Sequence, residues 1–425
     1  MNLIEELRWR GILEDASEGA SEALEAGPQT VYIGFDPTAD SLHLGHLLPV
    51  MGLVHLQRAG HQPVALVGGG TGLIGDPSGK DQERELLDRE RVEANLEGIG
   101  KQLEAFLDFE APSNPARLVN NLDWLGSMGV LDFLRDVGKH FPVGTMLRRE
   151  SVRRRLEGED SGLSFTEFSY QLLQAYDFLV LHDRLGCRVQ MGGSDQWGNI
   201  TAGIDLIRRA RAEKAYGLVF PLVTTSAGKK FGKTEAGAVW LSPERTSPYR
   251  FYQFWLNVDD GDVVAYLRYF TLLERERVEE LAQAVEERPH TREAQRALAE
   301  DVTRRVHGET ELERAQAASR VLFGGSVEGL SAEEVEEIFA DVPSSGVARD
   351  RLGGEGLSVV DLLEETGVAP SRSEARRTVK GGGVYLNNHR VDELDRHVTV
   401  EDALDGSFVV LRKGKRNYHL VRLEG

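Results

Sequence analysis

The sequence predicts an α/β protein in three parts: a parallel-sheet domain at 1–225, an α-helical domain at 226–340 and a small α+β module at 358–425. Three observations lead to this prediction. Strand-like and helix-like segments alternate in the first part, strand-like segments stop from about residue 245, and mixed structure returns near the C-terminal end. Such alternation favours parallel strands joined by right-handed crossovers.

The first predicted strand is TVYIGF at 30–35, which is rich in β-branched and aromatic residues. A Pro/Asp/Ser turn follows, and then a helix from about Gly45 to Arg58. A second strand is predicted at 63–68 and a long charged helix at 82–108. The other strands of this domain are predicted at Arg117–Asn120, Cys187–Met191 and Leu218–Thr224.

Residues 246–340 are predicted to form helix after helix, for example at 274–287 and 293–307. The segment 341–357 is rich in Gly, Ser and Pro, a composition typical of a linker. The module beyond it is predicted to hold helices at 358–367 and 371–381 and strands near 383–386, 407–412 and 417–423.

The amino-acid composition indicates a globular protein and limits its expected location and partners. With 40% hydrophobic and 28% charged residues, the chain has the balance of an ordinary globular protein, and no apolar run is long enough to span a membrane. A single cysteine excludes an internal disulfide, so a cytoplasmic location is expected. The net charge of -19 argues against nucleic acid as a partner unless basic residues cluster locally.

The motif HLGH at 43–46 joins the first strand to its helix. Helix N-termini at the carboxyl ends of parallel strands offer N–H groups to phosphates. His43 and His46 lie three residues apart and face the same way. Gly45 leaves room for an adenine ring against the backbone. The alternative is that both histidines merely cap a surface helix.

A glycine-bracketed basic loop, GKKFGKT, follows at 228–234 and carries Lys230 and Lys233. It could close over a triphosphate, or it could be an ordinary solvated loop. The two motifs together resemble the signature motifs of class I aminoacyl-tRNA synthetases. The resemblance implies an ATP site in which Lys233 contacts ATP. Lys80 and Arg84, on a polar loop after the second strand, are further candidates to reach phosphates.

The segment 165–184 is a predicted helix with Tyr170, Gln174 and Asp177 spaced i, i+4 and i+7, so all three share one face. That face could be the solvent side. Apolar residues elsewhere on the helix indicate burial on more than one face, and a buried carboxylate needs a polar partner. The next strand ends in the loop GGSDQWGN at 192–199, whose glycines let a ligand approach closely.

At this point the resemblance narrows to the bacterial tyrosyl-tRNA synthetases. It rests on FDPTADSLHLGH, GLIGDPSGK, FTEFSYQLLQAYDFL, GGSDQWGNITAG, KFGKT and TSPYRFYQFW, and it covers essentially the whole chain. It implies a Rossmann-like catalytic domain, ATP with Mg²⁺ and no protein-bound metal, and a homodimer in which the apolar segment around Phe133–Phe141 is a candidate interface.

The same resemblance implies roles for individual residues. Tyr32 and Asp177 would hold the substrate phenol hydroxyl, and Asp76, Tyr170 and Gln174 the substrate ammonium. Gln196 would lie near the carboxylate and Asp195 near the ribose. ATP phosphates or ribose would be contacted by Thr38, His43 and His46, and further nucleotide contacts are expected at Gly34, Asp36 and Gly45.

Basic residues cluster in two places. The C-terminal module resembles an S4 RNA-binding domain, and its candidate tRNA contacts are Arg372, Arg376, Arg377, Lys380, Lys413, Lys415 and Arg416. The alternative there is a solubilising basic tail. The second cluster contains Arg148 and Arg149, which could receive the acceptor end of tRNA or form a solvated helix face.

These observations together predict an enzyme that activates L-tyrosine with ATP and passes it to the 3′ end of tRNA(Tyr). Three alternatives stay open: a tryptophanyl-tRNA synthetase, another HxGH nucleotidyltransferase, and a non-catalytic RNA-binding protein on this scaffold. Tyr32 with Asp177 speaks against an indole pocket. The intact histidines and lysines of the two motifs speak against a non-catalytic role.

Overall fold

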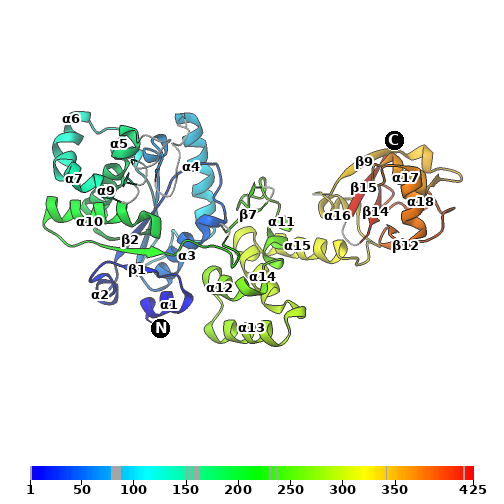
Figure 1. Cartoon of the computed structure of the whole chain (residues 1–425), viewed down its shortest axis with the longest axis horizontal. Coiled ribbons are helices and arrows are strands. Elements are labelled where there is room, and N and C mark those ends of the chain that lie inside the picture. Colours follow the sequence, from blue (N-terminus) through cyan, green and yellow to red (C-terminus); the bar gives the residue numbers. More distant parts are fainter. Residues whose placement is uncertain are drawn as a thin grey trace. The chain divides into compact units, whose positions relative to one another are not determined.

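The computed structural model of the chain describes residues 2–77, 88–149, 152–153, 156, 163–228, 231–234, 237–340, 342–414 and 417–425. The chain forms two compact units (Figure 1). The first unit comprises Met1–Thr246 with Phe254–Val306, and the second comprises Ser247–Gln253 with His307–Gly425.

A six-stranded sheet in the order β1-β6-β5-β2-β3-β4 forms the centre of the first unit. Its strands are β1 (Asp15–Ala16), β2 (Thr30–Phe35), β3 (Gln62–Val67), β4 (Arg117–Asn120), β5 (Cys187–Gly193) and β6 (Tyr216–Phe220). All pairs are parallel except β1 with β6. The chain builds outward from β2 to β4 and then returns to place β5 on the other side of β2. Ligands of such sheets bind at the carboxyl ends of the strands where this reversal occurs.

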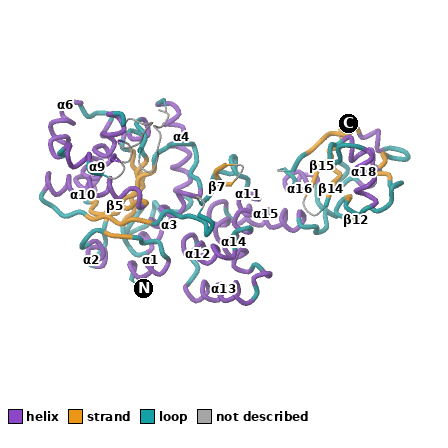
Figure 2. The backbone as a smooth tube through the Cα atoms, viewed as in Figure 1, coloured by secondary structure: helices purple, strands orange, loops and turns teal. Residues whose placement is uncertain are grey.

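Helices surround this sheet, and Figure 2 shows them in purple around the orange strands. They are α1 (Leu3–Arg10), α2 (Ala20–Glu25), α3 (Leu44–Arg58), α4 (Arg89–Glu104), α5 (Leu122–Leu125), α6 (Val130–Asp132), α7 (Val143–Leu147), α9 (Phe165–Leu185) and α10 (Trp197–Arg211). Helix α9 begins at a capping box, in which Ser164 accepts from the amide of Glu167, and it ends at Gly186 with a left-handed φ of 64°. Its residue Phe178 packs with Tyr32 and Val64 in the core of this unit.

The first unit also contains α12 (Asp260–Phe270), α13 (Arg275–Glu287) and most of α14 (Glu293–His307), while residues of α11 (Pro248–Leu256) belong partly to each unit.

The predicted fold class, a parallel α/β sheet followed by helices and a small α+β region, is confirmed. Strand β1 was not predicted, because two residues that include an acid give no strand pattern. No helix in the described parts of the chain has the length and apolar character required to cross a membrane.

The second unit is a five-stranded sheet in the order β12-β11-β14-β15-β9, together with a two-stranded sheet of β10 and β13. Its strands are β9 (Ser344–Ala348), β10 (Leu357–Ser358), β11 (Val384–Leu386), β12 (His389–Val391), β13 (His397–Val398), β14 (Phe408–Lys413) and β15 (Asn417–Glu424). Its helices are α15 (Glu309–Leu322), α16 (Ala332–Ile338), α17 (Val359–Glu365) and α18 (Arg372–Lys380).

Strand β14 shows why this unit has two cores. Val409 and Leu411 pack in a cluster with residues of α17 and α18. Phe408 and Val410, which alternate with them, pack instead in a cluster with residues of α15 and α16. Successive side chains of a strand point to opposite faces, so a continuous apolar strand is buried on both.

Within the segment 341–357, predicted as a linker, Ser344–Ala348 form strand β9 of this sheet. Strand β9 pairs in parallel with β15. Val347 and Leu352 are 2% and 0% exposed, so the two apolar side chains tie the segment into the core despite its Gly- and Ser-rich composition. The other domain boundaries stay predictions.

Candidate active site

The first turn of α3 holds the two histidines in one arrangement. Nδ1 of His43 accepts from the amide of Gly45 at 3.0 Å, and Nδ1 of His46 accepts from the amide of His43 at 3.2 Å, which forms a capping box. The rings stack with centroids 4.0 Å apart. Because both Nδ1 atoms accept, the neutral rings carry their hydrogens on Nε2. The pair therefore presents two N–H donors suited to phosphate oxygens.

The second motif lies directly against the first. Gly232 has a left-handed φ of 75°, and a Cβ there would be 2.8 Å from the Cβ of Leu44. Val239 links the two, because its amide donates to Gly232 at 2.9 Å and its carbonyl accepts from Leu44 at 3.0 Å. The short hairpin of β7 (Lys233–Thr234) and β8 (Gly237–Ala238) lies between these contacts.

Phe231 anchors the base of this hairpin. It is 7% exposed and stacks on Phe270 with centroids 5.0 Å apart, while Tyr266 lies at 4.8 Å. An aromatic side chain in this cluster fixes the point from which the basic loop leaves the body of the unit. Three of the predicted phosphate contacts, Lys80, Arg84 and Lys230, lie outside the described residues.

Asp177 is a fully enclosed carboxylate, 1% exposed, on α9. It accepts from Nε1 of Trp124 at 2.7 Å and from Nδ2 of Asn121 at 2.9 Å. Burial raises the pKa of Asp177 to about 7, although these two donors act in the opposite direction. The carboxyl group therefore lies near the boundary between its neutral and ionised forms at neutral pH.

Tyr32, on β2, belongs to the same apolar cluster, and its ring lies 5.2 Å from that of Phe178. Its hydroxyl is buried and has no hydrogen-bond partner within the described part of the chain. Burial raises the pKa of Tyr32 well above its usual range, and the charge of Asp177 adds to this. An unpaired buried hydroxyl is costly, so a ligand that supplies its partner is strongly favoured.

A second group of polar side chains continues from Asp177 toward α3. Asn121 donates through Nδ2 to Oγ1 of Thr71 as well as to Asp177, and Thr71 donates to Oδ1 of Asp36 at 2.8 Å. The hydroxyl of Tyr170 donates to Oδ2 of Asp36 at 2.7 Å. One continuous network thus joins β2, β4 and α9.

A third group lies at the end of β5. Gln196 donates to Oδ2 of Asp76 at 2.7 Å, and its own Oε1 accepts from Gln174 at 3.3 Å. Asn199 donates to Oε1 of Gln174 at 3.0 Å. The predicted ammonium ligands Asp76 and Gln174 are therefore brought together through Gln196.

The surface beside these groups is open where the nucleotide was predicted. Gly34 is exposed although its neighbours in β2 are buried, and Thr38, Gly45 and Asp195 are exposed as well. Acidic and amide side chains gather in the interior, and histidines and glycines lie at the edge. The geometry suits an amino acid held inside and a nucleotide laid across the carboxyl ends of β2 and β5.

Four residues of these networks were missed by sequence reasoning: Thr71, Asn121, Trp124 and Asn199. No motif marks Thr71, Asn121 or Trp124, and Asn199 stands in the predicted GGSDQWGN loop without a role of its own. Asn121 and Trp124 follow immediately after β4, however, and side chains at the carboxyl ends of parallel strands gather at one edge. That rule applied to every predicted strand would have flagged both.

Some of the predicted tRNA contacts are exposed, and others already make ion pairs or hydrogen bonds within the protein. Arg376, Arg377 and Lys380 are exposed on α18. Arg372 is ion-paired with Asp361, and Lys413 donates to Glu374 at 2.6 Å. Lys415 and Arg416 lie outside the described residues.

The two arginines of the second predicted cluster lie in different environments. Arg148 is exposed, whereas the guanidinium of Arg149 donates to the carbonyl of Gly198 in α10, and burial lowers its pKa. Arg149 thus faces the protein.

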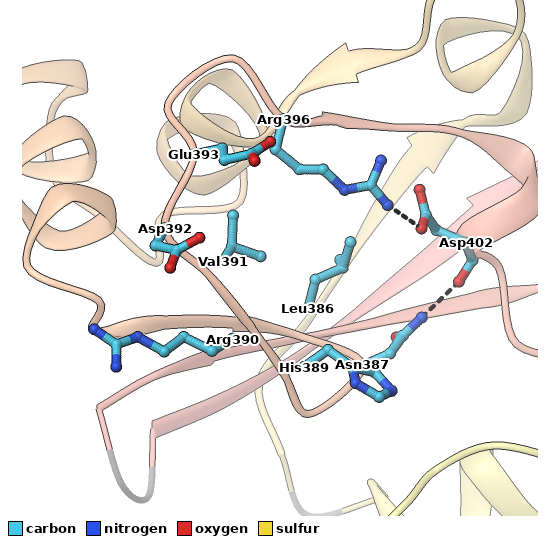
Figure 3. Close-up of a pocket in the computed structure, with 9 residues that line it drawn as sticks. All are labelled: Leu386, Asn387, His389, Arg390, Val391, Asp392, Glu393, Arg396 and Asp402. Carbon is cyan, nitrogen blue, oxygen red and sulfur yellow. Dashed lines mark hydrogen bonds and ion pairs between the residues drawn. The ribbon is translucent and has the colours of Figure 1, made fainter.

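A cavity of about 360 Å³ also lies in the second unit (Figure 3). Its lining carries both signs of charge: Arg390 and Arg396 lie among Asp392, Glu393 and Asp402, and Arg396 is ion-paired with Asp402. Its described lining includes no residue of the histidine or lysine motif and none of the described tRNA-contact candidates.

The fold and these motifs are those of a class I aminoacyl-tRNA synthetase. The family model described as tRNA synthetases class I (W and Y) matches residues 24–324, and the model of the tyrosine–tRNA ligase SYY-like C-terminal domain matches residues 334–421. The chain belongs to this family, as the sequence predicted.

Among its relatives, the tyrosine–tRNA ligase of Roseiflexus castenholzii is 58% identical over 421 residues and covers 99% of both chains. That of Geobacillus stearothermophilus is 51% identical over 425 residues, 99% of this chain and 100% of the relative. The solved structure of a C-terminally truncated mitochondrial tyrosyl-tRNA synthetase from Aspergillus nidulans matches with a TM-score of 0.68 and 31% identity, over 76% of this chain and 94% of that one.

Proposed function

We propose that the chain joins L-tyrosine to tRNA(Tyr) in two steps. In the first, a carboxylate oxygen of tyrosine attacks the α-phosphorus of ATP, the bond to the β-phosphate oxygen breaks, and tyrosyl-adenylate and pyrophosphate form. In the second, a hydroxyl of the terminal tRNA ribose attacks the tyrosyl carbonyl and releases AMP. The observation that carries the tyrosine assignment is the buried hydroxyl of Tyr32, which has no hydrogen-bond partner among the described residues and on which the charge of the enclosed Asp177 acts.

A substrate phenol completes this pocket. Its hydroxyl would donate to the ionised form of Asp177 and accept from Tyr32. Phenylalanine would enter the same space but leave the Tyr32 hydroxyl unpaired, at a cost of about 1–3 kcal/mol for a buried polar group, and Asp177 would lose the bond from the substrate. Discrimination therefore arises from the missing hydroxyl rather than from size.

The substrate ammonium would be held by Asp76, Tyr170 and Gln174, whose side chains border the phenol pocket. Gln196 is proposed to lie near the substrate carboxylate. Its Nε2 donates to Asp76 in the present arrangement. Tyrosine would take over that bond with its ammonium, which releases the Gln196 amide for the carboxylate.

ATP is proposed to lie across Gly34, Asp36 and Gly45, with Asp195 at the ribose. The oxygens of the α-phosphate gain charge as pyrophosphate leaves, and fixed donors stabilise that charge. Thr38, the two histidines, Lys80, Arg84, Lys230 and Lys233 would supply them. Magnesium would arrive with ATP, since it commonly binds through substrate phosphates.

The tRNA is proposed to bind the exposed basic face of α18 through Arg376, Arg377 and Lys380, with Lys415 and Arg416 nearby in the sequence. Recognition of this kind depends on backbone charge and shape. Arg372 and Lys413 would have to exchange an internal ion pair for a phosphate. They are therefore weaker contributors than their positions in the sequence suggest.

A homodimer is also proposed, and exposed apolar side chains support it. Val130, Leu131, Val143 and Phe165 are 72%, 78%, 59% and 77% exposed. Large apolar side chains exposed together, such as the adjacent Val130 and Leu131 of α6, are typical of a protein interface. Phe133 and Phe141 of the predicted segment pack partly into the core instead.

We also propose a cytoplasmic location, because tRNA is charged there for translation.

The test is amino-acid-dependent exchange of pyrophosphate into ATP, measured with each of the common amino acids. Exchange with tyrosine above all others is expected. Exchange that depends on tryptophan would establish the second candidate, a tryptophanyl enzyme, which the family model also covers. Exchange with neither would refute both.

A further inference from the structure

A tryptophan and an arginine beyond the lysine motif lie against the histidine pair. The indole of Trp240 meets the imidazole of His43 edge-on, with centroids 5.7 Å apart. The guanidinium of Arg245 lies over the same indole, 4.5 Å from its centroid. Nε of Arg245 also lies 2.5 Å from a carboxylate oxygen of Asp40, in the loop that precedes His43. The three side chains form a row that is tied back to the active-site loop.

Backbone hydrogen bonds hold Trp240 opposite His43. The two residues form an isolated antiparallel bridge. The flanking bonds run from Leu44 N to Val239 O at 3.0 Å and from Leu241 N to Leu42 O at 2.9 Å. Directly opposed residues of an antiparallel pair bring their side chains together on one face. The contact between indole and imidazole is thus fixed by the main chain.

The same segment is the continuation of the lysine loop. The amide of Val239 donates to Gly232 at 2.9 Å and closes the hairpin that contains Lys233, and Trp240 is the next residue. A displacement of the hairpin is therefore transmitted to the residue that contacts His43. Backbone hydrogen bonds thus join the lysine motif to the histidine motif at this point.

We propose that Trp240 and Arg245 are positioning residues for adenylate formation and act through His43. This inference rests on the proposed function. The direction of the His43 Nε2–H bond matters only as charge develops on the phosphate, so an imidazole that has lost one of its restraints lowers the rate more than it weakens binding. Arg245 limits the motion of the indole through a cation–π contact of its planar guanidinium, a group that a lysine lacks.

The test uses the full chain and variants at both positions. In tyrosine-dependent pyrophosphate exchange, Trp240→Leu is expected to lower kcat about ten-fold, the size of an aromatic contact, while KM for tyrosine stays unchanged. Trp240→Phe, which keeps a ring edge, should recover most of the loss. Arg245→Gln should lower kcat about three-fold, and Arg245→Lys should recover little of it.

A matched control is Arg188→Gln. Arg188 makes the same kind of contact with Tyr216, 5.6 Å from its centroid, but it lies near the start of β5 and the site lies at its end. No change in kcat is expected. A loss equal to that of Arg245→Gln would contradict the proposal, because it would show that any surface stack has this effect.

A double-mutant cycle separates positioning from general stability. In a His43→Ala background, Trp240→Leu should cost less than about two-fold, because the group it positions is gone. Equal losses in both backgrounds would overturn the inference, as would a fall in tyrosine affinity and thermal midpoint that accounts for the lost rate. If exchange proved to need another amino acid, the tyrosine proposal would fail, and the cycle would be run with that amino acid.

Discussion

Replacement of Asp177 by asparagine tests the pocket most directly. The change keeps the shape of the side chain but removes its charge. Two donors, from Asn121 and Trp124, already point at the two carboxylate oxygens. An asparagine has one oxygen for them and must turn its own NH₂ toward the other donor. The variant therefore loses an acceptor for the substrate phenol and leaves one internal donor unpaired.

The magnitude follows from these contacts. A hydrogen bond to a charged group is worth about 1.5–3 kcal/mol, which corresponds to a loss of about 10- to 100-fold in kcat/KM for tyrosine. Phenylalanine makes no such bond, so its kcat/KM should change far less. The assay is pyrophosphate exchange with both amino acids, and Asp183→Asn, at an exposed ion pair with Arg211 further along α9, is the control. An unchanged tyrosine-to-phenylalanine ratio would refute the pocket assignment.

The same variant should alter the pH dependence of stability. The folded protein holds the Asp177 proton up to a pKa of about 7, whereas an unfolded aspartate loses it near its ordinary pKa of 3.8. The folded state therefore binds more protons between these values, and stability falls as pH rises through this window. Three pKa units amount to roughly 4 kcal/mol. Asp177→Asn removes this contribution, so its thermal midpoint should fall less than that of the parent between pH 4 and pH 7.

Three further predictions follow from the structure. Gly232→Ala should lower exchange activity strongly, because its Cβ would meet Leu44 at 2.8 Å. Gly228→Ala has a similar left-handed φ and no described atom within 4 Å of the added Cβ, so it should show the effect of backbone strain alone, and equal losses would contradict the contact. Burial lowers the pKa of His55 to about 3, so only the unfolded state gains a proton between pH 6.5 and pH 3, and stability should fall as pH drops through that range. His55→Phe should flatten this slope in thermal melts, and an unchanged slope would assign it to other groups. A chain that lacks 325–425 should keep tyrosine-dependent exchange and lose tRNA charging, and loss of exchange as well would place the C-terminal part in the catalytic core.

Much of the fold could be predicted because it follows from local patterns. Strand β2 coincides with the predicted segment 30–35, since β-branched and aromatic residues are needed where a parallel strand is buried on both sides. Strand β9 was missed for the opposite reason. Its sequence SSGVA has one large apolar residue, and its place in the sheet depends on pairing with β15, which follows more than 70 residues later.

The site was predicted to the extent that motifs mark it. The two motifs that were read together do lie in contact, through Gly232 and Leu44. Asn121, Thr71 and Trp240 carry no signature, because an asparagine or a tryptophan acquires its role from what lies opposite it in space. Arg149 shows what the sequence does not specify: a cluster of arginines is compatible with an RNA surface or with contacts inside the protein, and here the Arg149 guanidinium donates to the carbonyl of Gly198.

The network from Asp177 through Asn121 and Thr71 to Asp36 and Tyr170 has a consequence for any attempt to change which amino acid is activated. Asn121 donates to Asp177 and to Thr71, Thr71 donates in turn to Asp36, and Asp36 also accepts from Tyr170. A replacement at one residue can leave its neighbour with a donor facing a donor or an acceptor facing an acceptor. That neighbour would then have to change as well, and so on along the row. Selectivity is thus a property of the whole row of side chains, and a redesigned pocket would have to exchange several of them at once.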